Sequence, residues 1–401
     1  MGKKGSGAQA RGRGPLTMQQ HRIPAVFMRG GTSKGVILQR RHLPADERKW
    51  DGLFLSAMGS PDPNGRQLDG MGGGVSSVSK ICVLGPPTRA DADVDYTFAQ
   101  VLIRESHVDY NALCGNMTAA VGPYAADEAL VKVSGENAAV RIHNTNTGKI
   151  IIARFAMDGG FAAVDGDCEI SGVPGSGAPV LLEFADPAGA STGKLLPSGA
   201  VAEDLELAEF GKVQVSMIDV SNACVFVKAE NIGLRGTELP AEIEGNPRVM
   251  ALLDDIRLSA SVRMGIATDR TAARKKTTIP YVAFVAPPAS ASTLSGDMLP
   301  AAGVDFVARA MSNGQAHRAL PLSVSMCLAA ASKIEGSVVH GVCRSDRADE
   351  ALRISMPSGD LRVTADVEQA NGEWSVKRGG FYRTQRRLFE GNLLVHAKAL
   401  A

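Results

Sequence analysis

Short runs of β-type residues, separated by turn-forming residues, recur along this chain and constrain its fold more than any other feature. Glycine, proline, aspartate and asparagine stand between the runs at turn positions. The runs occupy residues 23–28, 35–39, 81–85, 94–103, 138–143, 149–157, 179–185, 213–220, 223–229 and 281–287. Helical periodicity is clearest at residues 44–58, 114–132, 246–261, 303–313 and 321–333. The pattern predicts an α+β fold in which strands dominate.

Length and charge exclude several classes of function. The chain has 401 residues, 44% of them hydrophobic, so it can form two domains. Its 43 basic and 42 acidic side chains provide no concentrated basic surface for nucleic acid or an anionic membrane. It has neither an apolar run long enough to span a bilayer nor the apolar segment of a secretory signal. We therefore expect a cytoplasmic protein that acts on a small molecule, without nucleic-acid or membrane partners.

Six scattered cysteines argue against a disulfide framework and against a structural metal site. They form no C-x-x-C motif and no Cys/His pair at zinc spacing. We expect reduced thiols, most of them in the core, and no bound metal. The six residues are Cys82, Cys114, Cys168, Cys224, Cys327 and Cys343.

Residues 1–20 differ in composition from the rest of the chain. They include Lys3, Lys4, Arg11 and Arg13, lack acidic residues and contain few large apolar side chains. This composition predicts a disordered basic arm that does not take part in the fold. Contact of the arm with an anionic partner is the less favoured alternative.

A weak internal similarity relates the two halves of the chain. PAVFMRGGTSKGVIL in the first half is similar to PVLLEFADPAGASTGKLL in the second. Later in each half an alanine-rich helix is expected, in CGNMTAAVGPYAADEALV and LPLSVSMCLAAASKIEG. Two related α+β halves would place equivalent loops and helix N-termini opposite each other across a cleft.

One cysteine stands where a helical pattern begins. In NALCGNMTAAVG, residues 111–122, Cys114 precedes Gly115 and Asn116. The unpaired N–H groups and the dipole at a helix N-terminus favour negative charge, so such an end can activate a thiol or bind a carboxylate. Glycine lets a ligand approach the backbone, and asparagine offers a neutral donor and acceptor. Simple packing of a small apolar residue is the alternative, and the Gly-Asn pair favours function.

Lys80 enters an apolar strand directly after a glycine- and serine-rich stretch. DGMGGG at residues 69–74 leads into VSSVSK, which places Ser76, Ser77 and Ser79 beside the lysine. A desolvated amine can act as a general base, because desolvation favours the uncharged form. A lysine that extends its amine to the surface is the alternative, and these residues alone weigh the two about equally.

A third stretch, MRGGTSKG at residues 28–35, forms a polar turn between two expected strands. Arg29, the amide of Gly31 and the hydroxyls of Thr32 and Ser33 are groups that bind carboxylates. Taken alone, an ordinary tight turn is the favoured interpretation. The stretch lacks the spacing of a phosphate-binding loop, and no G-x-G-x-x-G motif predicts a dinucleotide domain.

Taken together, these stretches resemble the PrpF-type isomerases, a family that includes 2-methylaconitate cis-trans isomerase, 4-oxalomesaconate tautomerase, and methylitaconate or aconitate Δ-isomerases. The resemblance lies in MRGGTSKG, in SPDPNGRQLDGMGG with SSVSK, and in CGNMTAAVGPYA. It continues through RMGI at residues 263–266, YVAFVAPP at 281–288, IEGSV at 334–338 and the segment 357–376. These separate motifs occur in the same order, from about residue 22 to the C-terminus.

The resemblance implies a diaminopimelate-epimerase-like fold. Two similar α+β domains, each a mixed, mainly antiparallel sheet or open barrel around a central helix, would enclose the active site in the cleft between them. Residues 21–176 would form the N-terminal domain, completed by a strand near 381–397, and residues 177–380 the second domain. Catalysis would use no cofactor, with Lys80 and Cys114 as catalytic residues. The expected substrate-binding residues are Arg29, Gly31, Thr32, Ser33, Ser76, Ser77, Ser79, Gly115, Asn116, Met264, His317 and Ser323.

The implied reaction is a 1,3-allylic proton shift in a small unsaturated di- or tricarboxylate. Neutral Lys80 would remove a proton next to the double bond, and the helix N-terminus and nearby hydroxyls would stabilise the resulting anion. Cys114 would either return the proton at the far carbon or only position the substrate. The methylaconitate reaction is slightly favoured over the oxalomesaconate and aconitate reactions.

The second half departs from relatives in ways that bear on function. Its equivalent helix begins near residues 320–323 without a cysteine, and Cys327 is expected in the core, which disfavours a two-cysteine racemase or epimerase. Leu113 and Leu322 replace residues that are asparagine or part of a glycine-containing turn in many members, and they suit a methyl group. They also leave a non-catalytic, carboxylate-binding homologue as an alternative. His317 could bind an anionic substrate or support surface structure, and a homodimer is the expected assembly.

Overall fold

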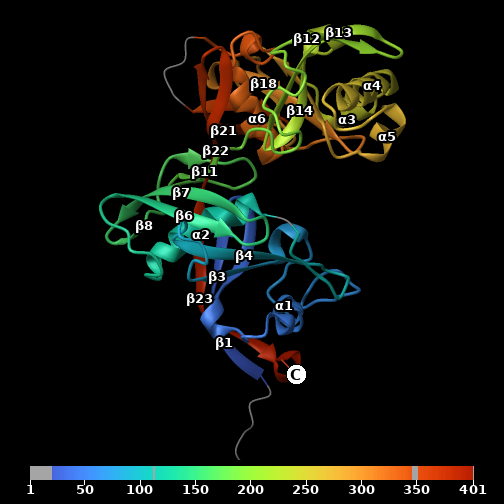
Figure 1. The fold of residues 1–401 in the computed structure, drawn as a ribbon. Helices are drawn as coiled ribbons and strands as arrows, with labels where there is room; N and C mark the ends of the chain where they lie inside the picture. Colours follow the sequence, from blue (N-terminus) through green and yellow to red (C-terminus); the bar gives the residue numbers. More distant parts are fainter. Residues whose placement is uncertain (1–19, 112, 346–350, 401) are drawn as a thin grey trace, which may run out of the picture.

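The computed structural model describes residues 20–111, 113–345 and 351–400. The ribbon is elongated, with two lobes stacked end to end and joined by long strands (Figure 1). The expected basic arm, residues 1–20, lies outside the described residues except for Gln20, which opens the first strand. Within the described residues, no helix is both long and apolar enough to cross a membrane.

The first lobe combines the first half of the chain with its last strand. That strand, β23 (Gln385–His396), pairs antiparallel with β1 (Gln20–Gly30). The other elements of the first half are β2 (Ser33–Gln39), α1 (Trp50–Met58), β3 (Lys80–Gly85), β4 (Val94–Val101), β5 (Val108–Asp109), α2 (Gly115–Asp127), β6 (Asn137–Asn144), β7 (Lys149–Asp158), β8 (Phe161–Ala162), β9 (Cys168–Glu169) and β10 (Ser176–Gly177).

The second half of the chain supplies the connecting strands and the second lobe. Its elements are β11 (Val180–Ala185), β12 (Glu203–Leu207), β13 (Gly211–Val220), β14 (Asn222–Lys228), α3 (Pro240–Glu244), α4 (Pro247–Arg263), α5 (Arg270–Lys275), β15 (Tyr281–Ala286), β16 (Ala291–Ser292), β17 (Met298–Leu299), β18 (Phe306–Ser312), β19 (Gln315–Ala316), α6 (Leu322–Lys333), β20 (Leu352–Met356), β21 (Gly359–Ala370) and β22 (Glu373–Arg383). Short 3-10 turns occur at Arg40–His42, Glu47–Lys49, Ser76–Val78, Ala229–Ile232, Ala301–Gly303, His340–Val342 and Ala397–Leu400.

Within the described residues, 19 strands form one network of mainly antiparallel pairings, while β9 with β10 and β16 with β17 form separate two-stranded sheets. β1 and β2 form a hairpin, and β3 joins β2 in parallel register. β11 pairs with β7 on one side and with β22 on the other, so it links the two lobes (Figure 1). The predicted α+β class with a mixed, mainly antiparallel sheet is confirmed. The division into domains at residues 176 and 177 stays a prediction.

Each lobe is built around one buried helix. Ten of the 13 residues of α2 are buried, as are nine of the 12 residues of α6. A helix that is apolar on all sides must be covered on all sides, and both helices are rich in alanine, which lets strands approach closely. The two alanine-rich helices expected from the sequence are therefore the central helices of the lobes.

The prediction of a helix at residues 303–313 is wrong, because these residues contain strand β18. All seven residues of β18 are buried. Phe306, Ala308 and Ala310 belong to the core around α6, whereas Val307 and Met311 belong to the core beneath α4. A strand that is covered on both faces has no alternation of polar and apolar residues, so its pattern cannot be distinguished from that of a buried helix.

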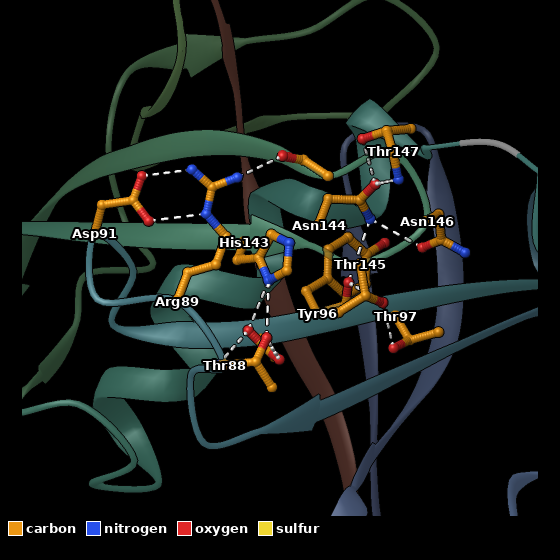
Figure 2. Close-up of polar contacts among 12 residues, drawn as sticks. Thr88, Arg89, Asp91, Tyr96, Thr97, His143, Asn144, Thr145, Asn146 and Thr147 are labelled. Carbon is orange, nitrogen blue, oxygen red and sulfur yellow. Dashed lines mark hydrogen bonds and ion pairs between the residues drawn. The ribbon is translucent and has the colours of Figure 1, made fainter.

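Figure 2 shows the polar contacts that join β4 to the end of β6. The side chain of Asn144 and the amide of Thr145 both donate to the carbonyl oxygen of Tyr96, at 3.3 and 2.9 Å. The hydroxyl of Tyr96 lies 3.7 Å from Sγ of Cys82 and contacts Thr118 of α2. Burial raises the pKa of Tyr96 and raises the pKa of Cys82 to about 12, so both groups stay protonated beneath α2.

Candidate functional site

The turn between β1 and β2 lies directly against the first residues of α2. Gly31 has a φ of 51°, and a Cβ atom there would lie 2.2 Å from Oδ1 of Asn116. A Cβ atom on Gly30 would lie 2.5 Å from the carbonyl oxygen of Asn116. Glycine permits this approach, and it brings the amide of Thr32 to 3.4 Å from Oδ1 of Asn116. The turn and the helix N-terminus therefore form one surface.

Arg29 and Ser33 maintain the shape of this turn. Nη1 of Arg29 donates to the carbonyl oxygens of Gly31 and Thr384, both at 3.1 Å, and to Oγ1 of Thr384 at 2.9 Å. Burial, followed by the nearby Arg386, lowers the pKa of the Arg29 guanidinium. Ser33 pairs with Gly30 in the hairpin and is only 4% exposed. At the tip of the turn, the side chain of Thr32 is exposed.

Lys80, the first residue of β3, is a buried residue whose amine is held by Gln100 of β4. The lysine is 7% exposed, its Nζ donates to Oε1 of Gln100 at 2.6 Å, and Nζ lies 4.9 Å from the centroid of the Phe98 ring. Nε2 of Gln100 donates to the carbonyl oxygens of Ser76 and Ser79, at 3.1 and 2.9 Å. These bonds fix the amide of Gln100, which in turn orients the amine of Lys80.

The serines before Lys80 occupy different environments. Ser79 is fully buried, and its Oγ donates to the carbonyl oxygen of Val101 at 2.8 Å and accepts from Nε2 of Gln67 at 2.7 Å. Ser76 and Ser77 begin a 3-10 turn, with Ser76 exposed and Ser77 half-buried. The hydroxyl of Ser79 is therefore committed to protein groups, whereas the other two lie nearer the surface.

Cys114 precedes α2 and has a half-buried thiol. Its carbonyl oxygen accepts from the amide and Oγ1 of Thr118, at 2.9 and 2.8 Å, which anchors the first turn of the helix. The thiol makes no capping hydrogen bond. The N–H groups of Gly115 and Asn116 are in the first turn, where a helix leaves its donors without internal partners. The helix therefore presents a thiol and two amides at one end.

Strand β3 and the start of α2 come together beside Gly35. A Cβ atom on Gly35 would lie 3.2 Å from Cβ of Lys80 and 3.2 Å from Cε of Met117. Met117 is in the first turn of α2, three residues after Cys114. Lys80 and Cys114 also both act electrostatically on the buried thiol of Cys82. The start of β3, which carries Lys80, therefore lies close to the start of α2, which follows Cys114.

The start of α6 in the second lobe meets the start of α2. A Cβ atom on Gly115 would lie 2.8 Å from Cδ1 of Leu322 and 3.1 Å from Cζ of Phe381. Ser323 follows Leu322, and its Oγ accepts from Nδ2 of Asn222 at 2.7 Å. Two helix N-termini therefore face each other between the lobes, as the similarity between the halves predicts.

The remaining second-lobe residues lie in other environments. Met264, at the end of α4, is 4% exposed and belongs to the core beneath α4, not to the core around α2 and α6. Nε2 of His317 lies 2.7 Å from Oγ of Ser312, and burial lowers the pKa of the imidazole. Cys327 is fully buried and donates to the carbonyl oxygen of Ile218 at 3.4 Å. The cysteine of α6 thus lies in the core, as expected, and not at the start of the helix.

Three residues that sequence reasoning missed complete this arrangement. Gln100 holds Lys80, Phe381 covers Gly115, and Nε of Arg383 donates to Oδ1 of Asn116 at 3.1 Å. Gln100 is 20 residues from Lys80, and Arg383 is 267 residues from Asn116. No local motif marks any of the three, because each reaches the site through strand pairing.

Two hollows of the surface lie away from Lys80 and Cys114. A cavity of about 620 Å³ is lined by residues in 52–69 together with Ser106, His396 and Ala399. Another, of about 660 Å³, is lined by residues in 194–201 and 369–374 together with Glu335. Neither is lined by Lys80 or Cys114. The candidate site is therefore identified by its functional groups and not by the volume of a cavity.

Comparison with known proteins identifies the family. The family model described as "PrpF protein" matches residues 20–396. The chain belongs to the PrpF family. This PrpF-family chain is 42% identical to the 3-methylitaconate isomerase of Eubacterium barkeri, over 95% of this chain and 99% of that protein. It is 39% identical to the 2-methyl-aconitate isomerase of Cupriavidus necator, over 93% of this chain and 96% of the relative.

A solved relative has the same fold. The crystal structure of a methylitaconate-delta-isomerase matches this PrpF-family chain with a TM-score of 0.87 and 41% sequence identity, covering 96% of this chain and 98% of the other. The membership predicted from the motifs is thus confirmed, and it extends across both lobes. The roles of individual site residues stay predictions.

Brief treatment of the PrpF-family chain with iodoacetamide at neutral pH should label Cys114 and Cys343, the two half-buried thiols. The other four cysteines are buried, and burial raises the pKa of Cys82 to about 12 and also raises the pKa values of Cys168 and Cys224. Because the thiolate is the reactive form, we expect labelling of Cys114 to be at least about 10-fold faster than that of Cys82. Peptide mass spectrometry measures both rates, and faster labelling of Cys82 would contradict the arrangement at α2.

Proposed function

We propose that this protein is an isomerase that moves the double bond of a small, methyl-bearing unsaturated di- or tricarboxylate by a 1,3-allylic proton shift, without a cofactor. The observation that carries the proposal is the convergence of the Lys80 amine, the Cys114 thiol and the Gly31 turn on the N-terminus of α2. The printed names of the relatives, isomerases of 3-methylitaconate and 2-methyl-aconitate, support it.

In the proposed reaction, Lys80 in its free amine form takes the proton from the carbon next to the double bond. One N–H of the amine donates to Oε1 of Gln100, and the lone pair of the free amine remains available to accept the proton. The negative charge spreads over the allyl system and its carboxylate, near the first-turn amides of Gly115 and Asn116. Cys114 delivers a proton to the far carbon, so the double bond moves and the net charge of the acid is unchanged.

The apolar contacts at the start of α2 favour a methyl-bearing substrate. Leu322 and Phe381 both pack against Gly115, and Leu113 is partly buried against the same core. A methyl group is accommodated beside such side chains, whereas an extra carboxylate there would lose hydration without gaining a partner. 3-Methylitaconate and 2-methylaconitate therefore rank ahead of aconitate and 4-oxalomesaconate.

A substrate panel in heavy water tests the proposal. The protein is incubated with 3-methylitaconate, 2-methylaconitate, cis- and trans-aconitate and 4-oxalomesaconate, and NMR follows both deuterium incorporation and product formation. We expect kcat/KM for a methyl-bearing acid to exceed that for aconitate by about 10-fold or more, the size of effect that one methyl contact provides. Absence of exchange with all five acids would overturn the assignment. A homodimer and a cytoplasmic location stay predictions.

A further inference from the structure

Arg383, at the end of β22, is a buried cation for which the described residues provide no carboxylate partner. It is 8% exposed. Its Nε donates to Oδ1 of Asn116 at 3.1 Å and its Nη1 donates to the carbonyl oxygen of Tyr382 at 2.9 Å. The ring of Phe381 lies against the guanidinium, with Cζ 5.3 Å from the ring centroid. Burial lowers the pKa of Arg383 to about 10, which reflects the cost of desolvating the charge.

Two other buried arginines of this chain provide a comparison. Arg257 is also 8% exposed, and its Nη2 pairs with Oδ1 of Asp254 at 2.8 Å. Arg309 is 1% exposed and donates to backbone carbonyl oxygens, while its Nη2 is fully enclosed without a partner. Nη2 of Arg383 differs from both, because the described residues give it no acceptor and yet do not seal it from solvent.

The position of Arg383 connects it to the candidate site. A Cβ atom on Gly31 would lie 3.0 Å from Cδ of Arg383, so the turn and the arginine are in contact. Oδ1 of Asn116 accepts from both Arg383 and the amide of Thr32. The NH2 group of the same side chain has no acceptor in the described residues. Asn116 follows Gly115 in the first turn of α2. Two sets of unused donors, on Asn116 and Arg383, therefore stand side by side.

We propose that Arg383 and the NH2 group of Asn116 bind one carboxylate of the substrate, and that Arg383 thereby makes that carboxylate a requirement for turnover. The inference rests on the proposed function and extends it to a residue from the far end of the chain. A guanidinium presents parallel N–H donors that match the two oxygens of a carboxylate. The bound carboxylate supplies the negative partner that the buried cation of Arg383 lacks. The substrate is thereby held at the end of α2 next to Cys114.

The test compares Arg383→Met with the unmodified full chain on three probes, which are 3-methylitaconate and its two monoamides. Each monoamide keeps the carbon skeleton and neutralises one carboxylate. We expect kcat/KM for the diacid to fall about 100-fold in Arg383→Met, the effect of losing one partner of a buried charge pair. With the monoamide that lacks the recognised carboxylate, Arg383→Met should lower kcat/KM by less than about 5-fold. The matched control is Arg378→Met, an exposed arginine of the same strand, which should leave all three values unchanged.

A purely structural role for Arg383 would lower kcat/KM by the same factor for the diacid and for both monoamides, and that result would overturn the proposal. The change in melting temperature on adding each probe is measured in parallel, so binding is scored even without turnover. If the unmodified chain turns over none of these probes and none of the five acids of the substrate panel, the proposed function fails. The Arg383 proposal then stands only if the diacid raises the melting temperature of the unmodified chain and not that of Arg383→Met. Arg383→Lys, which keeps the cation without the planar fork, replaces Arg383→Met if the latter does not fold.

Discussion

Lys80→Met is expected to lower isomerisation and deuterium exchange by about 1,000-fold or more, within the range that a positioned general base contributes. Methionine is similar in length to lysine and apolar, so it can occupy the 7% exposed position on β3 against the Phe98 ring. The substitution removes the amine that takes the first proton, and without that step neither exchange nor isomerisation can begin. Heavy-water NMR with 3-methylitaconate measures both, and thermal unfolding confirms that the variant is folded.

The matched control for Lys80 is Lys212→Met, at the start of β13. The side chain of Lys212 is 64% exposed and pairs with Glu206 at the surface, so its replacement should leave activity unchanged. Gln100 contacts the amine of Lys80 and is unsuitable as a control. Activity near that of the unmodified chain in a folded Lys80→Met variant would overturn the assignment of Lys80 as the base.

Cys114→Ala is expected to separate the two proton transfers. If Lys80 removes the proton and Cys114 returns one at the far carbon, the variant should still exchange deuterium at the first carbon while product formation falls about 100-fold. Alanine preserves the backbone before α2, where the carbonyl oxygen of residue 114 accepts from Thr118, so the helix should keep its position. The two NMR signals are followed in the same reaction, which makes their ratio independent of enzyme concentration.

Cys343→Ala serves as the matched control for Cys114, because Cys343 is the other half-buried thiol. It should leave both exchange and product formation unchanged. A Cys114→Ala variant in which exchange and product formation fall by the same factor, through a raised KM, would show that Cys114 only positions the acid. The pair of measurements therefore decides between the two roles that the residue types alone leave open.

Much of the fold follows from local pattern. Strand β3 and helix α2 are recognisable because apolar runs and an alanine-rich segment are bounded by glycine or by polar residues. The family also follows from sequence, since its motifs cluster at MRGGTSKG, SSVSK and CGNMTAAVG, and the family match confirms it. The sequence pattern of strand β18 predicts a helix, because burial on both faces removes the alternation that identifies a strand.

Some residues of the candidate site can be recognised from local sequence, and others cannot. Lys80 and Cys114 stand out in the sequence because of their neighbours. Lys80 follows a glycine- and serine-rich stretch, and Cys114 precedes Gly115 and Asn116. Arg383, Gln100 and Phe381 carry no such signal, because they come from strands whose partners are far away in the chain.

Composition and motif order were enough to predict the α+β class and the family, both of which are confirmed. The resemblance to the family also singled out Lys80 and Cys114, whose roles stay predictions. The groups that surround Lys80 and Cys114 become known only from the folded structure. It placed Leu322 against Gly115 and Arg383 against Asn116, and it committed Arg29 to the backbone of its own turn. Such contacts arise from strand register and from the meeting of two helix ends, which no local stretch of sequence encodes.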